Sequence, residues 1–510
     1  MQSYKIPYSK TKQFSNLVID YLANDEKLKP FISDFPTIDS FEKQITEKQN
    51  YPVNRDVLVS VLKEQNKEFN LTEISNDNID LLFSEDAFTV TTGHQLCLFT
   101  GPLYFTYKII SIINLAEELK EKYPTNNFVP VFWMATEDHD FEEIKSINLF
   151  GKKVNWESEQ EGAVGKMKLN GIAKIIQELE GKLGDNEHAN NLIELFKNAY
   201  LNHAILADAT RYLVNELFGK YGIVIIDGDD KKLKNEFVPI MKNDILNNSY
   251  KSKIEGTSGR LYENYKAQAF FRDINFFKLS EGKRELITAG IPESEIENHP
   301  ELFSPNVRMR PLYQESILPN IAYVGGGAEV AYWMQLRDVF TNENIPMPLL
   351  VLRNSAMLIS DKQKQKFKSL GFEINDLFSA IDELKKQYVL SNSKEDITLN
   401  IEKCELEELY NKLLLKTNDK GLQASVNASH QKQLKSFEKF EQKLIRLEKK
   451  KHENALNTIS KIKQQLFPEN CLQERFDNFI PFYLKEGENF IEMLKDNLDP
   501  LDTNFVVLSY

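Results

Sequence analysis

Five short, almost wholly apolar runs occur between residues 88 and 355, and each one ends in polar or glycine-rich residues. They cover residues 88–92, 128–135, 222–226, 321–324 and 348–352. Runs that are apolar along their whole length are typical of strands buried on both faces of a parallel sheet. Because such sheets bind ligands outside the carboxyl ends of their strands, the five polar endings are expected to converge.

The first run has the most informative ending. Its β-branched residues favour a strand, which ends in Thr92-Gly93-His94-Gln95 before the chain passes through Gly101-Pro102 into a helical pattern that lasts to residue 123. Proline at the first helical position loses only an N–H group that would be unpaired there anyway. The pattern predicts a βα unit with a histidine beside a helix N-terminus, whose free N–H groups attract phosphate or carboxylate.

The rest of the chain is divided by the same patterns into a core and an arm. Residues 1–360 form the predicted core, in which residues 1–86 alternate short helical patterns with polar breaks and are expected to wrap the sheet. Two segments, about 151–218 and 231–305, are interpreted as insertions between strands. Residues 361–467 are predicted to form a helical arm, and residues 468–510 to return to the core.

The predicted arm lies in a stretch from residue 349 to 467 that has no proline and only two glycines, Gly371 and Gly421, which indicates helices throughout. Apolar residues step mostly by threes and fours through its second half, and Lys451 interrupts them. They are Val426, Leu434, Phe437, Phe440, Leu444, Leu447, Ala455, Ile459, Ile462 and Leu466. With the periodic stretch 367–415 before it, this seam predicts an antiparallel coiled-coil hairpin that turns near Gly421. A solvated arm that makes a homodimer is favoured over a ligand-binding role.

Composition narrows the class of protein. A length of 510 residues indicates two or three domains, and a net charge of -13 argues against a protein that binds nucleic acid over a broad surface. The first residues lack the apolar core of a secretory signal, and no run approaches the length of a membrane span, so we expect a cytoplasmic protein with no membrane partner. Three scattered cysteines are too few for a disulfide framework or a structural zinc site.

A second candidate site follows the second strand, where Glu137, Asp138 and Asp140 surround His139. Such crowding should raise the pKa of at least one carboxyl group by like-charge repulsion and should favour the protonated imidazole. The three carboxylates are assigned to binding substrate amines, and His139 or a carboxylate such as Asp138 to removing the ammonium proton. A magnesium ion escorting a nucleotide is an alternative, and so is a solvated acidic turn.

Further candidates follow the later strands. Gly325 and Gly326 let backbone pass close to a ligand, although tight strand-to-helix packing explains them equally well. Glu329 is placed for an amine, and Tyr332 and Trp333 for a cleft wall. Arginine offers a planar fork of donors suited to carboxylates, and some of these arginines are expected to be structural. The candidate arginines are Arg308, Arg310 and Arg353, with Asn306 and Asn354 to orient them.

Several motifs, taken together and in order, carry a family resemblance. They are TTGHQLCLFTGPLYFTYK, FWMATEDHDFEEI, IDGDD, SPNVRMRPLYQESILPNIAYVGGGAEVAYW and LLVLRNS, from about residue 87 to 355, with a weaker LQERFDNF near residue 472. The chain resembles the cysteine-adding enzymes of bacillithiol biosynthesis. The resemblance implies an α/β fold: a Rossmann-like parallel sheet core related to class I aminoacyl-tRNA synthetases and nucleotidyltransferases, with two connecting insertions and a coiled-coil domain that supports a homodimer.

The same resemblance implies substrates and roles. The substrates would be L-cysteine and glucosaminyl-malate, joined by an amide bond. The four residues Thr92 to Gln95 occupy the place of the first synthetase signature, where the histidine assists attack at the α-phosphate of ATP. His94 would then contact phosphate or carboxylate, Gly93 would allow close approach, and Gln95 would orient a substrate oxygen. The alternative for His94 is a structural tie to backbone carbonyl groups.

Two differences from class I synthetases limit which residue roles the resemblance implies. No Lys-Met-Ser-Lys-Ser type loop is present, and no Cys/His set resembles the zinc site by which cysteinyl-tRNA synthetases select a thiol. Use of ATP, with or without magnesium, is therefore a hypothesis motivated by the Thr-Gly-His-Gln loop. The competing functions are a nucleotidyltransferase-like enzyme and a non-catalytic binding or scaffold protein of the same pathway.

Overall fold

The structure is a computed structural model that describes residues 2–266, 272–280, 282–288, 290–393 and 397–510. Its described residues divide into two compact units. The larger unit comprises residues 7–356 and 473–506, and the smaller one comprises residues 2–6, 357–472 and 507–510. No helix among these described ranges is both long enough and apolar enough to cross a bilayer.

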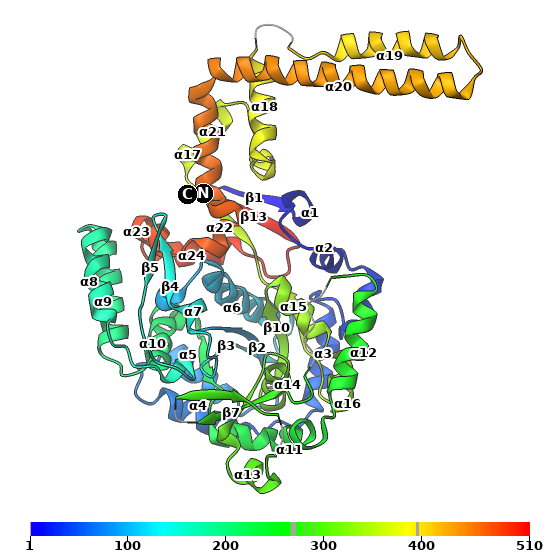
Figure 1. Ribbon diagram of the computed structural model, residues 1–510. Helices are drawn as coiled ribbons and strands as arrows, with labels where there is room; N and C mark the ends of the chain where they lie inside the picture. The colour runs from blue at the N-terminus through cyan, green and yellow to red at the C-terminus, as the bar shows by residue number, and fades with distance from the viewer. Residues whose placement is uncertain (1, 267–271, 281, 289, 394–396) are drawn as a thin grey trace. The chain divides into compact units, whose positions relative to one another are not determined.

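A five-stranded sheet forms the centre of the larger unit (Figure 1). Its order is β11-β10-β2-β3-β6, and every neighbouring pair is parallel. The strands are β2 (Ala87–His94), β3 (Asn127–Met134), β6 (Val224–Asp227), β10 (Asn320–Gly325) and β11 (Leu349–Leu352). The five predicted strands and their parallel arrangement are confirmed.

The order of the strands fixes where a ligand site is expected. Counted along the chain, the strands lie in the order 5-4-1-2-3, which is the Rossmann order read from the other edge. β2 is the first strand, and its two neighbours β3 and β10 are reached by connections that leave in opposite directions. The carboxyl ends of β2 and β10 therefore border the topological switch point, which is where ligands bind in sheets of this class.

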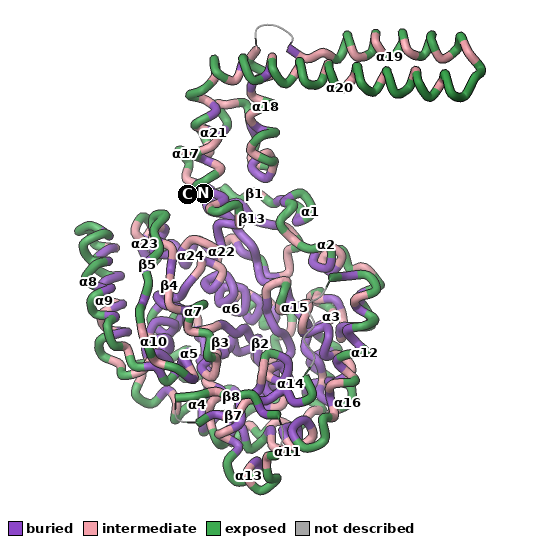
Figure 2. Tube along the Cα trace, in the orientation of Figure 1, coloured by how far each residue is buried: buried purple, intermediate pink, exposed green. Residues whose placement is uncertain are grey.

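Buried helices hold this sheet in place (Figure 2). α6 (Tyr104–Lys122) follows β2 and packs against β2, β3 and β10 with twelve buried residues. It begins at Tyr104, after Gly101-Pro102, close to the predicted start. α3 (Ser40–Gln49) packs against β10 and α4 (Arg55–Asn66) against β6, so the N-terminal helices wrap the core as expected.

Most of the remaining elements of the larger unit belong to the two insertions. The first insertion and its approach contain α7 (Phe141–Ile144), β4 (Ser146–Leu149), β5 (Lys152–Asn155), α8 (Ile172–Leu183), α9 (Glu187–Leu201) and α10 (Leu206–Phe218). The second contains α11 (Lys231–Asn247), α12 (Lys251–Tyr262), β7 (Phe276–Ser280), β8 (Lys283–Leu286), α13 (Glu293–Asn298) and β9 (Phe303–Pro305). The larger unit also contains α1 (Tyr8–Thr11), α2 (Asn16–Leu22), α5 (Glu73–Leu81), α14 (Met309–Ile317), α15 (Gly327–Met334), α16 (Arg337–Asn342), α22 (Gln473–Phe476), α23 (Ile480–Glu486) and α24 (Asn489–Asn497).

The small sheet formed by both ends of the chain corrects two predictions. β1 (Gln2–Pro7), β13 (Asn504–Ser509) and β12 (Ala356–Ile359) form a three-stranded sheet in the order β1-β13-β12. The prediction of helices throughout residues 349–467 is therefore wrong at β12, and that of short helices alone at the N-terminus is wrong at β1. Both strands depend on β13, which lies far away along the chain, so no local periodicity could indicate the pairing.

The predicted helical hairpin of the arm is confirmed. α17 (Asp361–Ser369) and α18 (Ile381–Asn392) lead into α19 (Asn400–Leu414) and α20 (Lys420–Lys451), and α21 (Glu453–Leu466) follows. α19 and α20 run antiparallel, since Lys403 pairs with Glu441 at 2.9 Å while Tyr410 stacks on His430 nearer the turn. Phe440 and Leu447 are 55% and 61% exposed, so these two seam residues do not pack inside the hairpin. The homodimer through this arm stays a prediction.

Candidate functional site

A buried ion pair lies at the boundary of β2 and β10. Lys108, on the second turn of α6, donates from Nζ to the carbonyl oxygen of Gly93 at 2.8 Å and lies 2.5 Å from Glu329 Oε2. Sequence reasoning did not select Lys108. A single lysine within the apolar stretch of a helix was the available signal, because a buried charge needs a partner.

Glu329 is ionised by its surroundings. Burial alone would raise its pKa, but Lys108, the Tyr323 hydroxyl donating at 2.6 Å and the Gly326 N–H donating at 2.8 Å lower that pKa to about 2. The amine predicted for Glu329 is here supplied by Lys108 of the same chain. A Cβ atom on Gly325 would lie 3.0 Å from Glu329 Cβ, so tight strand-to-helix packing, the alternative reading, explains that glycine.

The other predicted residues at this boundary take different positions. Thr92 is buried and donates to the carbonyl oxygen of Val324 at 2.7 Å, which ties β2 to β10. Trp333 is fully buried and stacks on Tyr323 at 4.4 Å between ring centroids. Trp333 is therefore a packing residue and does not line a cleft, contrary to the prediction. Tyr332 is partly exposed.

His94 is the last residue of β2 and is 8% exposed. Its Nδ1 atom lies 2.8 Å from the carbonyl oxygen of Gln95, so Nδ1 carries the proton and Nε2 keeps a free lone pair. The structural tie stated as the alternative for His94 is thus present, and it orients the ring. Burial, helped by Lys108, lowers the pKa of His94 to about 4, so the imidazole is neutral at pH 7. A neutral ring with a free Nε2 lone pair suits an amine or hydroxyl donor, and an oxyanion contact would require protonation.

This lowered pKa gives a testable dependence of stability on pH. The unfolded chain protonates the imidazole below about pH 6.5 and the folded chain only near pH 4, so stability from this group is complete above pH 6.5 and is lost as the pH falls toward 4. The difference in unfolding free energy between the wild type and His94→Gln should shrink by about 3 kcal/mol between pH 7.5 and pH 4. Urea denaturation across that range measures it, and a difference that does not vary with pH contradicts it.

Cys97, close to His94, is not a nucleophile in this setting. Its Sγ atom lies 3.9 Å from His94 Nδ1, the nitrogen already used for the backbone contact. Burial raises the pKa of the thiol to about 12, so the thiolate is absent at neutral pH. A covalent thioester on this cysteine is therefore not supported.

Gln95 joins the two predicted candidate loops. Its Nε2 donates to Asp138 Oδ2 at 2.7 Å and to Glu143 at 2.6 Å, and Ala135 N–H donates to the carbonyl oxygen of His94 at 3.0 Å. The histidine after β2 and the acidic loop after β3 therefore lie on one edge of the sheet, as the order of the strands requires. Asp138 also accepts from the backbone N–H of His139 at 2.7 Å.

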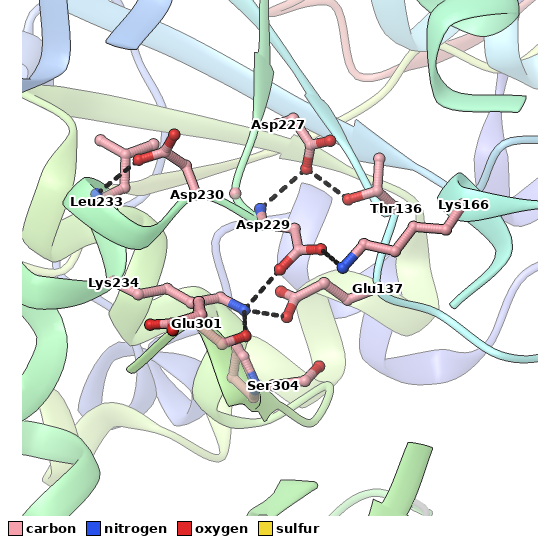
Figure 3. A network of polar contacts seen from close by, with 12 residues as sticks. Thr136, Glu137, Lys166, Asp227, Asp229, Asp230, Leu233, Lys234, Glu301 and Ser304 are labelled. Carbon is pink, nitrogen blue, oxygen red and sulfur yellow. Dashed lines mark hydrogen bonds and ion pairs between the residues drawn. The ribbon is translucent and has the colours of Figure 1, made fainter. Parts of the chain in front are cut away.

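The acidic side chains at the ends of β3 and β6 form a network around a buried lysine (Figure 3). Lys234 Nζ, which is fully inaccessible, donates to Glu137 Oε1 at 2.6 Å and to Asp229 Oδ1 at 2.8 Å. Asp227, at the end of β6, accepts from the Thr136 hydroxyl at 2.5 Å. Burial raises the pKa of Glu137, with Asp229 adding like-charge repulsion and Lys234 opposing both. A raised carboxyl pKa was predicted from repulsion, but burial is the larger cause.

His139 and Asp140 differ from the prediction of an imidazole enclosed by carboxylates. His139 is half-exposed; its Nδ1 atom lies 2.9 Å from Arg284 Nη1, which donates to it, and 3.7 Å from Asp138 Oδ1, so one carboxylate and one guanidinium neighbour the ring. Arg284 belongs to the β7–β8 hairpin, and nothing near it in the sequence indicates this contact. Asp140 caps α7 by accepting from the backbone N–H of Glu143 at 3.3 Å.

Both insertions contribute cations to this edge. Besides Arg284 from the second, Lys166 from the first lies 2.7 Å from Asp229 Oδ2. The backbone N–H of Gly165 donates to the carbonyl oxygen of Thr136 at 2.8 Å, and a Cβ atom on Gly165 would lie 2.6 Å from Thr136 Cβ, so only glycine permits this approach. Within the described ranges, no group of three or more His, Cys, Asp or Glu side chains is arranged to hold a metal ion.

The three candidate arginines have different partners. Arg308 donates to Gln335 at 2.7 Å, and Arg353 donates to Glu474 of the C-terminal segment at 2.7 Å and to the carbonyl oxygen of Asn354 at 2.8 Å. Both are buried and structural. Asn306 accepts from backbone N–H groups of Arg308 and Met309, and Asn354 bonds Ser111 and the carbonyl oxygen of Asp499.

Arg310 is the candidate without an acidic partner. It is partly exposed, and among the described residues no carboxylate lies within ion-pair distance of it. Nη1 donates to Gln314 at 2.8 Å, and the guanidinium lies over the rings of Tyr323, Trp133 and Trp333. Tyr332 interacts with the guanidinium, yet Nη2 is buried without an acceptor in good geometry. A Cβ atom on Gly93 would lie 3.7 Å from Nη1, which places Arg310 beside the end of β2.

Two surface hollows lie elsewhere. One, of about 560 Å³, borders α11 and α13, and another, of about 260 Å³, borders α9 and α10. Neither is lined by a predicted site residue. The chemistry at the sheet edge therefore identifies the candidate site better than surface shape does.

Comparisons with known proteins agree with this architecture. Residues 1–354 match the family model described as bacillithiol biosynthesis BshC, N-terminal Rossmann-like domain, and residues 356–510 match the BshC C-terminal coiled-coil domain. Three similar proteins, each named "Putative cysteine ligase BshC", come from Flavobacterium johnsoniae, Christiangramia forsetii and Cytophaga hutchinsonii. They are 43%, 42% and 36% identical, and each alignment covers 99% of this chain and 98% or 99% of the relative.

Proposed function

Because this chain belongs to the BshC family of bacillithiol biosynthesis, we propose that it is a ligase that joins L-cysteine to glucosaminyl-malate through an amide bond. The relatives' names support the ligase and cysteine as a substrate. Glucosaminyl-malate as the second substrate, ATP as the activator and magnesium as its escort are parts of the proposal.

One observation supports this function best: the carboxyl edge of the sheet has two halves of different charge. At the β2–β10 switch point, Arg310 is a cation that no carboxylate of the described residues contacts directly, although the charge of Glu329 acts on it, and its free donors suit the carboxylates of malate or a phosphate. At the ends of β3 and β6, Glu137 and Asp229 are paired with Lys234, and Asp138, which is partly exposed and accepts from Gln95, is the carboxylate that suits an amine. A substrate with a dicarboxylate at one end and an amine at the other matches both halves.

The proposed reaction has two steps. A carboxylate oxygen of cysteine attacks the α-phosphorus of ATP, the bond to the bridging oxygen breaks, and pyrophosphate leaves. The amine of glucosaminyl-malate then attacks the acyl carbon, and AMP leaves with the electron pair of the broken C–O bond. Catalysis would come mainly from positioning and from placed charges.

His94 is assigned to the second step. Its free Nε2 lone pair would accept a hydrogen bond from the neutral amine and take the proton as the C–N bond forms. The N–H of the amine becomes more acidic as the C–N bond forms, so the imidazole would accept the proton late in that step. Gln95, already held by Asp138, would orient the amine or a neighbouring hydroxyl group.

Product formation with purified protein tests the function. We expect L-cysteine, glucosaminyl-malate, ATP and magnesium to yield the amide, detected by mass spectrometry, and pyrophosphate to exchange into ATP only when cysteine is present. Folded protein that yields no amide would reject the ligase and leave the scaffold function. Exchange that needs no cysteine would favour a nucleotidyltransferase, and amide formation without exchange would reject the adenylate route.

A further inference from the structure

A line of buried hydrogen bonds runs from Arg310 into the interior. On α14, Arg310 Nη1 donates to Gln314 Oε1 at 2.8 Å, and Gln314 Nε2 donates to Glu315 Oε1 at 2.9 Å. Lys48 Nζ, from α3, donates to the carbonyl oxygen of Glu315 at 2.8 Å and lies 3.6 Å from Oε2. Gln314 and Glu315 are fully inaccessible, and Lys48 is 2% exposed.

The direction of these bonds follows from the charges at the two ends of the line. Glu315 Oε1 accepts from the side-chain amides of both Gln314 and Asn320, so the amide NH₂ of Gln314 turns toward Glu315. The amide oxygen then has to face Arg310, whose guanidinium only donates. Lys48 provides the positive charge that balances Glu315 in the interior. Without Glu315 the amide of Gln314 would be held from the Arg310 side only.

A purely structural role explains the pair poorly. Replacing a buried ion pair by well-packed apolar side chains is often neutral or stabilising, so stability alone does not require Lys48 and Glu315. Glu315 has a second branch, in which it accepts from Asn320 at 2.7 Å while Asn320 accepts from Thr89 and Thr91. That branch ends within the sheet and does not reach Arg310.

We propose that Lys48 and Glu315 are positioning residues that act through Gln314 to orient the Arg310 guanidinium toward an anionic substrate group. The inference rests on the proposed function, in which Arg310 receives a carboxylate of the acceptor substrate. It extends the site to two residues that lie deep in the fold and touch no ligand.

The double variant Lys48→Met/Glu315→Leu separates positioning from stability, because it removes both buried charges together. We expect a folded protein with a lower thermal midpoint than the wild type, because the buried amides of Gln314 and Asn320 lose their acceptor. Malate, used as the probe, should bind at least about tenfold more weakly in calorimetry. The KM for glucosaminyl-malate should rise by a similar factor with kcat little changed, as for lost binding common to ground and transition states. Wild-type malate affinity in this variant would overturn the inference.

A cycle with Arg310→Met tests the coupling. Arg310→Met should weaken malate binding by at least as much, and adding Lys48→Met/Glu315→Leu to it should cause no further loss. Additive losses would overturn the inference, because the pair would then act independently of Arg310. If Arg310→Met binds malate as the wild type does, the anionic subsite of the proposed function is itself wrong.

Two further variants follow the line of hydrogen bonds. Gln314→Leu, which cuts the link and keeps the ion pair, should weaken malate binding as the double variant does. Thr89→Val is the matched control, because it disturbs the second branch of the same network without touching the link to Arg310. A loss of affinity in Thr89→Val equal to that in Gln314→Leu would show a general effect of network disruption and would overturn the proposed role.

Discussion

Lys234→Met is expected to lower the free energy of unfolding by roughly 3–5 kcal/mol. The lysine is fully inaccessible, and its Nζ atom contacts Glu137 and Asp229 at 2.6 and 2.8 Å and the carbonyl oxygen of Glu301 at 3.2 Å. The two carboxylates raise the pKa of Lys234 against the effect of burial, so it is charged. Removing it leaves Glu137 without its lysine partner and Asp229 with only the exposed Lys166, so the two carboxylates repel each other. Urea denaturation at pH 7 measures the loss.

Lys166→Met is the matched control for this prediction. Lys166 pairs with the same Asp229 at 2.7 Å, but its side chain is 66% exposed, so water and salt screen the interaction. Its removal should cost less than about 1 kcal/mol. Equal losses in the two variants would mean that burial does not set the strength of these contacts, and the account of the network would be wrong.

His94→Ala is expected to lower kcat for amide formation by about 10²- to 10⁴-fold, the range typical of a lost general acid or base. The change removes an imidazole that is neutral at pH 7 and whose Nε2 lone pair is oriented by the contact between Nδ1 and the Gln95 carbonyl oxygen. Because His94 acts on the proton of the attacking amine, the KM for cysteine should change little. Product formation at saturating substrates, followed by mass spectrometry, measures the effect.

His203→Ala is the control for His94→Ala. His203 also contacts a backbone carbonyl oxygen through Nδ1, that of Ala199 at 2.9 Å, and stacks on Phe69, but it lies between α9 and α10 in the first insertion. Its replacement should leave kcat near the wild-type value. If His94→Ala retains wild-type kcat in folded protein, the proton acceptor is a different group and the role assigned to His94 is wrong.

The two lysine variants and the two histidine variants test different properties of one sheet edge. The lysine pair tests whether buried cations hold the acidic residues in place, which is a question of stability. The histidine pair tests whether the end of β2 takes part in the chemistry. If Lys234→Met is strongly destabilising while His94→Ala retains wild-type kcat, the buried lysine holds the acidic residues in place and a group other than His94 accepts the proton, and the ligase function itself would stand.

The elements of the fold could be predicted where a local pattern specifies them. The five apolar runs predicted the five parallel strands, and the chain from Gly101-Pro102 predicted a helix that begins at Tyr104. The seam on either side of Gly421 predicted the α19–α20 hairpin. In each case the spacing of apolar residues within one segment indicates which of its faces is buried. Residues close together in the sequence are therefore enough to predict the element.

The small sheet β1-β13-β12 could not be predicted in this way. β1 lies at the N-terminus, β13 lies at the C-terminus and β12 covers Ala356–Ile359. Both β1 and β12 pair with β13, which is far from each of them along the chain. Hydrogen bonding between strands depends on which chains meet, and no periodicity within one strand records that.

Several residues of the candidate site could be predicted from the sequence, but their contacts could not. The positions of His94 and Glu137 after buried strands pointed to one sheet edge, because parallel strands share that edge whatever their partners are. Arg310 was predicted from its guanidinium alone, and only the structure places it beside the end of β2. Their protonation and pairing depend on Lys108, Arg284 and Lys234, which come from a helix, an insertion hairpin and a second insertion helix. A charge is balanced by whatever lies within a few ångströms in space, so partners far apart in the sequence become known only when the chain is folded.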